Sequence, residues 1–512
     1  MLNCAREDYI GGGMVVPRWS RMWTETMVPL CGLAALILVV FHSTLREWFT
    51  GGDTLPLIWA DRLHSGNGLL RLLAEPMGVS KTFAANVGLY WRPVSMLSYS
   101  LDFAISGLHP IAYQATDLCI VFLTAIAVRW AARSVFCIGS WASWGAAYLF
   151  VLHPIMASVV PVVSRRQSLL GTLFTLLALS LLALGLEGKS LQARSWAKAG
   201  SVCATALAVG SIEAAVLVLP LLIAYVVCVP PRELRRIVAL WPHAVVLGIW
   251  FGIRWLVLGG IGGRMGLGFH LRAILHTAPN TIGMFLLGNV APVLVTLAHD
   301  RHTIGAMLVV ASLVTLLAVF RKAWRPKGSA NRVIVICGAW WALSVALYVI
   351  TQTFDLWNLT DSVAAISIGL TFLIDAALRG RSVRAAALPC SLAVWLVGSS
   401  VFANPRWEWR CVAGTDHTIA QGVTSLIVTH PNAAEVIITN LPTAAVQRGD
   451  LRLGYMGPEG LKSWLAMQTP NVHVVIASVA EPLACSDHVL LPFSVIGLTM
   501  RVNVQTRPGH TS

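Results

Sequence analysis

Residues 90–128 read YWRPVSMLSYSLDFAISGLHPIAYQATDLCIVFLTAIAV. The stretch begins with two aromatic residues and an Arg-Pro pair, and it continues as an amphipathic segment that carries Asp102. After a break at Gly107–Pro110 it runs into an apolar helix with Asp117 near its start. Charged groups at the edge of apolar helices are energetically costly and usually functional. This stretch therefore predicts a functional region at the boundary of a membrane.

The composition of the whole chain supports a membrane location. Of its 512 residues, 56% are hydrophobic and 12% are charged, with a mean hydropathy of +0.71, whereas soluble domains are about 25% charged. A soluble globule could not bury so much apolar surface, so the bilayer must be the solvent for much of the chain. The net charge of +14 does not indicate a nucleic-acid partner, because many basic residues cluster in short loops between apolar runs. That distribution is typical of cytoplasmic loops.

The apolar runs predict about eleven membrane spans. They cover residues 27–43, 110–128, 136–152, 168–186, 199–209, 214–229, 238–258, 303–320, 333–350, 361–378 and 385–402. The runs 199–209 and 214–229 form either two crossings or a deep hairpin. The apolar stretch 278–297 is interpreted as a re-entrant or outer-face helix, because a full crossing there would place a basic cluster at residues 321–332 outside.

Three regions follow from these spans. We expect a cytoplasmic N-terminal tail at 1–26, a transmembrane domain at 27–402 with an outer loop at 44–109, and an extracytoplasmic C-terminal domain at 403–512. The first apolar run follows a basic segment and lacks an obvious cleavage site, which indicates a signal anchor. Apolar alternation at 435–439 and 472–477 predicts strands. The expected fold class is an all-α polytopic membrane protein with a small C-terminal α+β domain outside the membrane.

The ten cysteines include no CxxC pair and no metal-ligand spacing. Most of them lie in apolar runs, where a free cysteine behaves as a small hydrophobic residue. Cys411 and Cys485 both lie in the C-terminal region, where oxidation is permitted. They form either a disulfide or two buried thiols.

Five pieces of the sequence, in order over about residues 45–380, resemble the tetratricopeptide-repeat-linked O-mannosyltransferases and their bacterial relatives, which belong to the GT-C class of membrane glycosyltransferases. The pieces are the 90–128 stretch, FVLHP at 150–154, VSRRQSLLGTLF at 163–174, SIEAAVLVLP at 211–220 and RWLVLGG at 254–260. The resemblance implies a GT-C fold. The chain has no internal repeat of fixed period, so we expect no tetratricopeptide array.

The chain also departs from the family pattern. The family carries two adjacent acids after its first span, whereas here Gly52 precedes a single acid, Asp53. Ser168 and Ile212 replace an acid and a lysine of the family motifs, and residues 360–367 (TDSVAAIS) lack a Glu and an Arg that the family has there. These departures leave the expected fold unchanged but keep open that the chain is an inactive relative.

The resemblance implies transfer of a sugar from a polyprenyl-phosphate donor to an acceptor hydroxyl at the outer membrane face. The acceptor oxygen needs a base, which is typically a carboxylate. Asp53 is the candidate base because its position matches the second acid of the family pair. The alternative is a solvated acid in a Gly-Gly-Asp turn. Asp61 is a poorer candidate, since its surroundings are helical and polar.

The departing lipid phosphate needs cations, and arginine suits bidentate contact with phosphate oxygens. Arg92 and Arg166 are the candidates for binding the phosphate. The alternative is that both side chains reach lipid headgroups at the interface. Arg165 is expected to be a surface charge. Arg254 is either a supporting residue or a helix-end anchor.

Three further acids lie within or against apolar helices: Asp102, Asp117 and Glu213. A buried acid must be neutral or paired. We expect them to support the site, with the alternative that the two aspartates pair with Arg92 or cap a helix. His153, at a His-Pro turn, is expected to be a structural cap.

No cofactor is expected, and a divalent metal is compatible with the chemistry but unsupported. Residues 299–302 (HDRH) are better interpreted as an interfacial loop than as a metal site. The Gly-rich loop at 259–268 follows no predicted strand and has no GxGxxG motif, so it does not indicate a nucleotide site. The sequon at 358–360 lies against the membrane and is assigned no role.

Three functions remain open at this stage. The first is a glycosyltransferase that uses a polyprenyl-phosphate sugar and an unknown glycan or protein acceptor. The second is an inactive relative that binds the lipid-linked sugar or acts as an envelope-assembly scaffold. The third is a transporter or flippase, against which stands the absence of a hydropathy repeat and of interrupted helices in matching halves. In each case we expect a bacterial inner-membrane protein with a cytoplasmic N-terminus and an extracytoplasmic C-terminal domain.

Overall fold

A computed structural model describes sixteen segments of the chain. They are residues 23–62, 68–77, 90–187, 190–228, 235–260, 330–351, 356–379, 383–402, 406–429, 435–438, 441–442, 447–448, 451–452, 456–469, 473–476 and 479–480. The predicted span at 303–320, the stretch at 278–297, the HDRH cluster and most of the Gly-rich loop lie outside these segments.

The chain divides into two compact units. Unit 1 comprises Met1–His42, Leu118–Val159 and Arg166–Asn404, and unit 2 comprises Ser43–Asp117, Val160–Arg165 and Pro405–Ser512. Each unit is therefore built from segments that are distant in the sequence.

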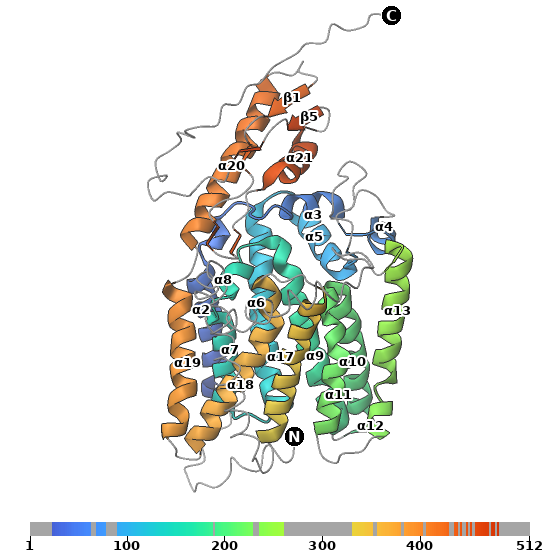
Figure 1. Ribbon diagram of the computed structural model, residues 1–512, viewed down its shortest axis with the longest axis vertical. Helices are drawn as coiled ribbons and strands as arrows, with labels where there is room; N and C mark the ends of the chain where they lie inside the picture. The colour runs from blue at the N-terminus through green and yellow to red at the C-terminus, as the bar shows by residue number, and fades with distance from the viewer. Residues whose placement is uncertain are drawn as a thin grey trace, which may run out of the picture. The chain divides into compact units, whose positions relative to one another are not determined.

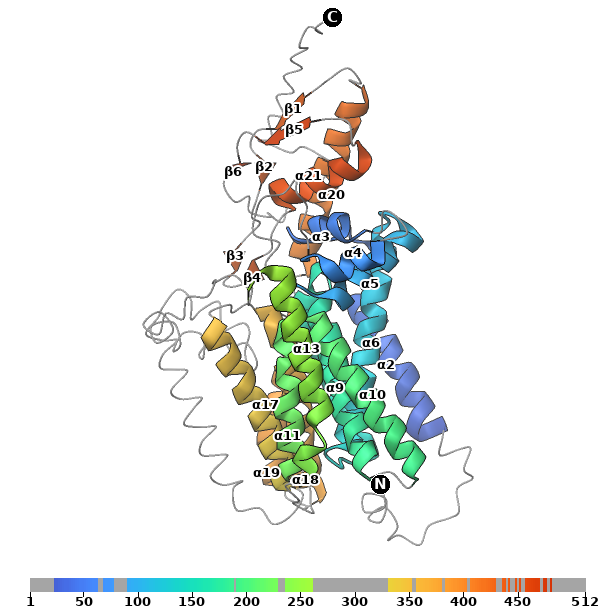
Figure 2. The same cartoon turned by 90° about the vertical axis from the view of Figure 1, so that its right-hand side faces the viewer.

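The regular elements of unit 1 are all helices within its described residues. Its elements are η1 (Trp23–Met27), α2 (Val28–Phe41), most of α6 (Pro110–Ser134), α7 (Ser140–Leu152), α8 (Met156–Val159), α9 (Arg166–Glu187), α10 (Leu191–Ser211), η5 (Glu213–Leu217), α11 (Val218–Cys228), α12 (Arg235–Val238), α13 (Trp241–Leu258), α17 (Ala330–Thr351), η6 (Leu356–Leu359), α18 (Thr360–Arg379) and α19 (Val383–Phe402). Helix α18 packs against α7, α17 and α19 (Figure 1). Helix α10 packs against both α9 and α13, and α11 packs on α9; α13, α9 and α10 run alongside one another in Figure 2.

Four of the described helical segments are long and apolar enough to cross a membrane. They are Pro110–Ser134, Val163–Leu186, Arg236–Leu258 and Thr360–Arg379. Four shorter apolar segments, Glu25–Phe41, Glu213–Cys228, Val335–Tyr348 and Pro389–Gly398, also coincide with predicted spans. The long apolar runs that fall within the described residues therefore form helices, as predicted.

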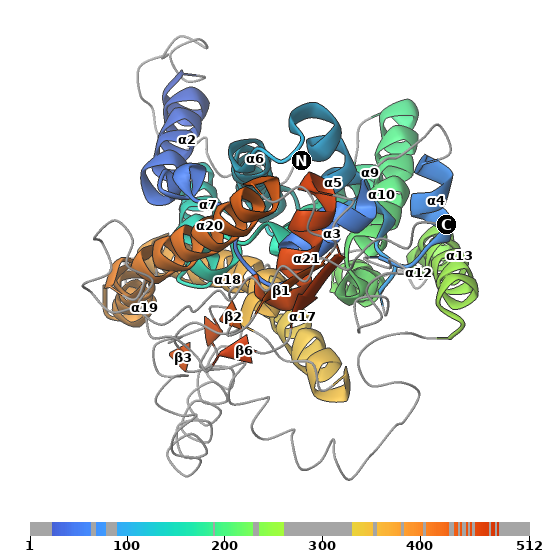
Figure 3. The same ribbon diagram turned by 90° about the horizontal axis from the view of Figure 1, so that it is seen from above.

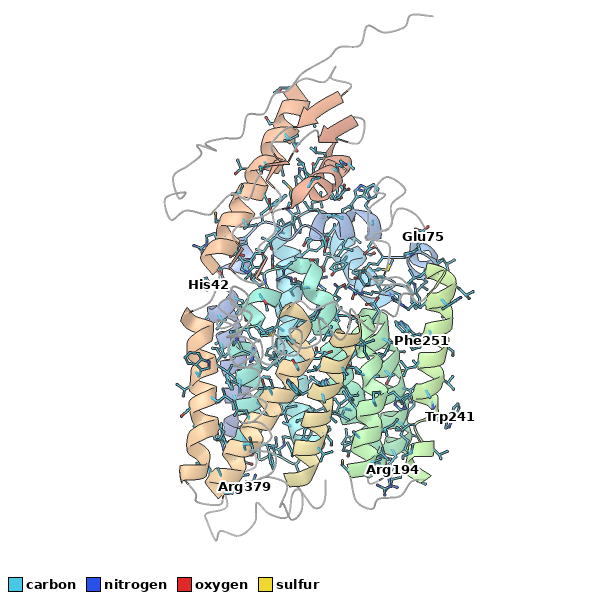
Figure 4. All side chains as sticks on the ribbon, viewed as in Figure 1. His42, Glu75, Arg194, Trp241, Phe251 and Arg379 are labelled. Atoms are coloured by element: carbon cyan, nitrogen blue, oxygen red, sulfur yellow. The ribbon has the colours of Figure 1, made fainter. Side chains whose placement is uncertain are left out.

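Helix α10 begins at Leu191, eight residues before the predicted start at 199. Its first turns are polar, so hydropathy alone did not include them. Ser190 caps this end of the helix, because its side chain accepts a hydrogen bond from the amide of Ala193 at 3.2 Å. Arg194, in the polar extension, and Arg379, at the end of α18, lie at the same end of unit 1, whereas His42 lies at the opposite end (Figure 4).

Unit 2 combines helices with short strands. Its elements are η2 (Thr44–Arg46), α3 (Thr54–Asp61), α4 (Gly68–Ala74), α5 (Pro93–Ser106), the start of α6, η4 (Val163–Arg165), α20 (Arg406–Thr429), α21 (Gly457–Gln468), β1 (Glu435–Ile438), β2 (Leu441–Pro442), β3 (Gln447–Arg448), β4 (Leu451–Arg452), β5 (His473–Ile476) and β6 (Val479–Ala480). Strands β1 and β5 pair in parallel, with Glu435 opposite His473, and they coincide with the two alternating segments of the sequence. A parallel pair needs a crossover connection, and α21 lies within it.

The outer loop and the C-terminal region share one hydrophobic core within unit 2. Its buried residues include Phe49 and Leu55 from the loop and Ile419 and Leu461 from α20 and α21. Figure 3 shows α20 and α21 side by side, next to β1. The sequence analysis assigned the loop to the transmembrane domain, whereas the structure groups it with the C-terminal region.

Candidate functional site

Asp53 lies on a turn that the surrounding residues hold in place. The hydroxyl of Thr50, a buried residue, donates to the carbonyl oxygen of Pro161 at 2.7 Å. Gly51 has φ +85°, and a Cβ at this position would lie 2.8 Å from Cγ1 of Val162. A residue with a side chain would thus be strained here both by its φ and by this neighbour. The turn therefore has a defined path.

The side chain of Asp53 is exposed at the N-cap position of α3 and makes no capping hydrogen bond. Its carboxylate has no hydrogen bond or ion pair to any residue in the described part of the chain. The lone pairs of this carboxylate are thus available to an acceptor hydroxyl, which is the geometric requirement for a general base.

The segment at 161–165 runs past this turn and is held from two helices. The hydroxyl of Tyr99 on α5 donates to the carbonyl oxygen of Val163 at 3.2 Å, and Nε2 of Gln114 on α6 donates to that of Pro161 at 3.5 Å. Arg165, predicted to be a surface charge, is only 9% exposed, and its guanidinium lies 5.5 Å from the centre of the buried Trp409 ring. That prediction was wrong, because the aromatic ring covers the cation.

The two arginines assigned to the phosphate are also buried. Arg92 precedes the first turn of α5, is 9% exposed, and places its guanidinium 4.2 Å from the centre of the Tyr90 ring. Arg166 is the first residue of α9 and is 1% exposed. Burial of both side chains disfavours the alternative in which they reach lipid headgroups. Arg92 belongs to unit 2 and Arg166 to unit 1.

The acids of the 90–128 stretch are buried inside their helices. Asp102 accepts a hydrogen bond from the hydroxyl of Thr116 at 2.8 Å, which ties α5 to α6. Asp117 is 1% exposed and lies in the third turn of α6. Neither aspartate stands at a helix start, so neither caps its own helix. Asp61, the last residue of α3, is also buried.

Two of the predicted supporting residues meet in unit 1. Glu213 is separated from the end of α10 by Ile212 alone, and Arg254 lies in the last turns of α13. Nη1 of Arg254 is 2.8 Å from Oε1 of Glu213, and the guanidinium lies 5.3 Å from the centre of the Trp250 ring. The arginine side chain is 5% exposed. It is therefore bound within the protein, which disfavours its interpretation as an anchor to headgroups.

A second polar pair joins α9 to α18. The hydroxyl of Thr172 hydrogen-bonds to Oδ1 of Asp361, in the first turn of α18. Asp361 begins the segment that lacks the family's Glu and Arg, and sequence reasoning gave it no role. The sequence feature that could have identified Asp361 is a single acid in the first turn of an apolar helix. A Cβ on Gly171 would clash with Cγ2 of Ile212, so this part of α9 packs closely on the residue before Glu213.

Sequence reasoning also missed two residues of α20. Asp416 is fully buried, and its Oδ2 accepts a hydrogen bond from the amide of Met456 at 3.0 Å. Burial raises the pKa of Asp416 well above its usual range, although the bond from Met456 opposes the shift. Burial lowers the pKa of His417, whose ring centre is 5.6 Å from that of Trp48. The sequence feature that could have identified Asp416 is an acid inside the apolar stripe of an amphipathic helix.

Within the described residues, no group of three or more His, Cys, Asp or Glu side chains could hold a metal ion. Cys411 is disulfide-bonded. Cys485 lies outside the described residues, so the pairing of these two cysteines stays a prediction.

No family model matches the chain, and no curated protein matches it. Two solved structures are similar to it, and both are crystal structures of ArnT from Cupriavidus metallidurans. The structure bound to undecaprenyl phosphate has 12% identity and a TM-score of 0.42. The apo structure has 14% identity and a TM-score of 0.44. Each comparison covers 88% of this chain and 89% of the other. At these values the likeness assigns neither residues nor an activity to the chain.

Proposed function

We propose that the chain is a membrane glycosyltransferase of the GT-C class. It would transfer a sugar from a polyprenyl-phosphate donor to a hydroxyl group of a glycan or protein acceptor. The observation that carries the proposal is the carboxylate of Asp53, which is exposed on a turn held by Thr50 and Gly51. The ordered sequence resemblance supports it, and Asp53 stands where the family has its second acid.

The proposed reaction follows from ordinary acid–base chemistry. Asp53 accepts the proton of the acceptor hydroxyl, and the oxygen forms a bond to the anomeric carbon of the sugar. The bond between that carbon and the phosphate oxygen breaks, and the lipid phosphate leaves with the electron pair. Arg92 and Arg166 are proposed to bind the phosphate, because guanidinium groups stabilise its developing charge.

The proposed orientation rests on the distribution of basic residues. Arg194 and Arg379 lie at one end of the unit 1 helices (Figure 4), and the positive-inside rule assigns such an end to the cytoplasm. We place the chain in a bacterial inner membrane, with the C-terminal region in the extracytoplasmic space.

An inactive relative that binds the lipid-linked sugar, or that acts as an assembly scaffold, is the second candidate. One observation favours it: Asp361, in the segment that lacks the family's Glu and Arg, is engaged by Thr172. A hydrogen-bonded acid at this position would hold two helices together rather than contact substrate. The described helices add no support for a transporter.

The test is a transfer assay with the purified protein in detergent, radiolabelled polyprenyl-phosphate sugars and membrane acceptors. Asp53→Asn should lower the transfer rate by about 10²–10⁴-fold, which is the usual contribution of a general base. Glu75→Gln is the matched control, because it also neutralises a carboxylate of the outer loop. Equal loss in both variants would exclude a specific role for Asp53. Saturable donor binding without transfer in the wild type would favour the inactive relative.

A further inference from the structure

The ion pair between Glu213 and Arg254 joins two partners with different exposure. The side chain of Arg254 is 5% exposed and that of Glu213 is 23% exposed. The indole of Trp250 lies beside the guanidinium, with 5.3 Å between its ring centre and Cζ of Arg254. Glu213 belongs to a short 3₁₀ segment, whereas Arg254 belongs to an 18-residue helix. The carboxylate is thus the more accessible of the two partners.

A guanidinium can bind a carboxylate or a phosphate through the same planar set of N–H donors. A carboxylate at 2.8 Å from Nη1 therefore occupies a position that a phosphate oxygen could take. The two anions cannot share one side of the cation without repulsion. Glu213 and a phosphate would thus compete for Arg254.

The helix that carries Arg254 presents apolar side chains away from its neighbours. Phe251, Ile253, Trp255 and Leu256 are 48%, 39%, 51% and 82% exposed, and the labelled Trp241 lies at the outer side of α13 (Figure 4). Phe251 lies one turn before Arg254 and is its neighbour on the helix surface, whereas Ile253, Trp255 and Leu256 lie on other faces of α13. A phosphate attached to a hydrocarbon chain matches both the cation and the exposed ring of Phe251 beside it.

We propose that Glu213 is the resting counter-ion of Arg254 and that the phosphate group of a polyprenyl-phosphate lipid displaces it. The ion pair would keep the buried cation neutralised while the site is empty, since an unpaired buried charge is costly. Glu213 would then weaken donor binding and speed release of the lipid phosphate product. This inference rests on the proposed function, and it assigns Glu213 a positioning role rather than a catalytic one.

A second carboxylate–arginine pair in the same unit provides a matched control. Asp375 and Arg379 lie one turn apart on α18, with Nη2 of the arginine 2.9 Å from Oδ2 of the aspartate. Arg379 is 49% exposed and lies at the end of unit 1 where Arg194 is found (Figure 4). Neutralising Asp375 removes the same kind of charge at a place where no lipid phosphate is proposed to bind.

The experiment measures binding of farnesyl phosphate to the detergent-solubilised full chain by calorimetry, with phosphatidylglycerol and inorganic phosphate as comparison ligands. Glu213→Gln should tighten binding of farnesyl phosphate by about fivefold, the factor expected for removing one partly exposed competing charge. Asp375→Asn should leave the dissociation constant unchanged. Arg254→Gln should weaken binding, and the double variant should behave like Arg254→Gln alone. Glu213→Asp, which keeps the charge on a shorter side chain, should lie between Glu213→Gln and the wild type.

Weaker or unchanged binding in Glu213→Gln, with a thermal midpoint like that of the wild type, would overturn the inference. If transfer still depended on Asp53 in that case, the proposed function would stand. An equal gain for inorganic phosphate or phosphatidylglycerol would overturn the assignment to a prenyl phosphate. A wild type that neither binds farnesyl phosphate nor transfers sugar would overturn both proposals.

Discussion

Unit 1 and unit 2 satisfy their buried polar side chains in different ways. In unit 1 the partner is often a side chain on a neighbouring helix: Thr172 meets Asp361, Ser201 lies 3.0 Å from Nε2 of His243, and Arg254 pairs with Glu213. Helix backbones use their own amides and carbonyls. A polar side chain in such a bundle therefore ties two helices together.

In unit 2 the partner is often the backbone of an irregular segment. Thr50 donates to the carbonyl of Pro161, Tyr99 donates to that of Val163, and Asp416 accepts from the amide of Met456. Such segments leave backbone groups that need partners when buried. A polar side chain in unit 2 therefore determines the path of a loop, and Asp53 lies on one of these loops.

The largest loss of stability should come from removing a hydrogen bond between a side chain and the backbone in unit 2. Thr50→Val keeps the shape of a buried side chain but leaves the carbonyl of Pro161 without its hydroxyl donor at 2.7 Å. Loss of one partner of a buried hydrogen bond costs about 1–3 kcal/mol. Amide hydrogen exchange should become faster in peptides that cover residues 45–58 and 158–166.

Thr418→Val is the control for this prediction. Thr418 is half-buried, and its hydroxyl donates an exposed hydrogen bond to the carbonyl of Gly414 one turn earlier on the same helix. Its loss should leave the exchange rates almost unchanged. If the two variants exchanged alike, the loop around Asp53 would owe its path to packing instead of this hydrogen bond.

A smaller loss of stability should follow from removing a hydrogen bond between side chains of neighbouring helices in unit 1. Ser201→Ala deletes the hydroxyl that contacts His243 and donates to the carbonyl of Ala178 at 2.7 Å. Side-chain hydrogen bonds between membrane helices contribute about 0.6 kcal/mol on average. The thermal midpoint in detergent should fall slightly, and less than in Thr50→Val. Ser134→Ala, whose hydroxyl bonds only within α6 in the described structure, should show no change, and an equal fall there would contradict the cross-helix role.

At mildly acidic pH, Asp416→Asn should change the thermal midpoint least of these variants. The asparagine side chain can still accept the hydrogen bond from the amide of Met456. The pKa of Asp416 is raised by burial in the folded protein, so the unfolded chain releases this proton first. The wild type should therefore lose stability as the pH rises above the usual carboxyl range.

Asp416→Asn should remove that loss, so its thermal midpoint should gain on that of the wild type as the pH rises above the usual carboxyl range. The lowered pKa of His417 acts in the opposite direction, since protonation at low pH destabilises the folded state. His417 is present in both proteins, so its contribution cancels in the difference. Parallel pH profiles would mean that Asp416 is ionised in the folded protein.

Much of the fold could be predicted because the bilayer imposes a simple rule on apolar runs. The runs at 168–186 and 361–378 coincide with α9 and α18 to within two residues at each end. The rule fails where a helix leaves the apolar region, and so the polar start of α10 was missed. Helix α20 was missed for a related reason, because its apolar residues form only one stripe.

The candidate site was less predictable than the fold. The sequence singled out Asp53, Arg92, Arg166, Glu213 and Arg254 one at a time, by type and position. The burial of Arg165 against Trp409 and the pairing of Thr172 with Asp361 depend on segments far apart in the chain. The local sequence pattern carries no information about such partners. Hydrophobic periodicity shows which face of a helix is apolar, but it does not show which segment of the chain packs on that face.

The sequence by itself determined that the chain is apolar enough to need a membrane, where its long helices run, and which charged residues stand at their edges. Only the tertiary structure decided which charges are paired and which are exposed. Glu213 and Arg254 are 41 residues apart and meet at 2.8 Å, while Asp53 keeps its carboxylate exposed. The physical reason is that hydrophobic burial acts locally along each helix, whereas charge pairing depends on distances that only packing sets.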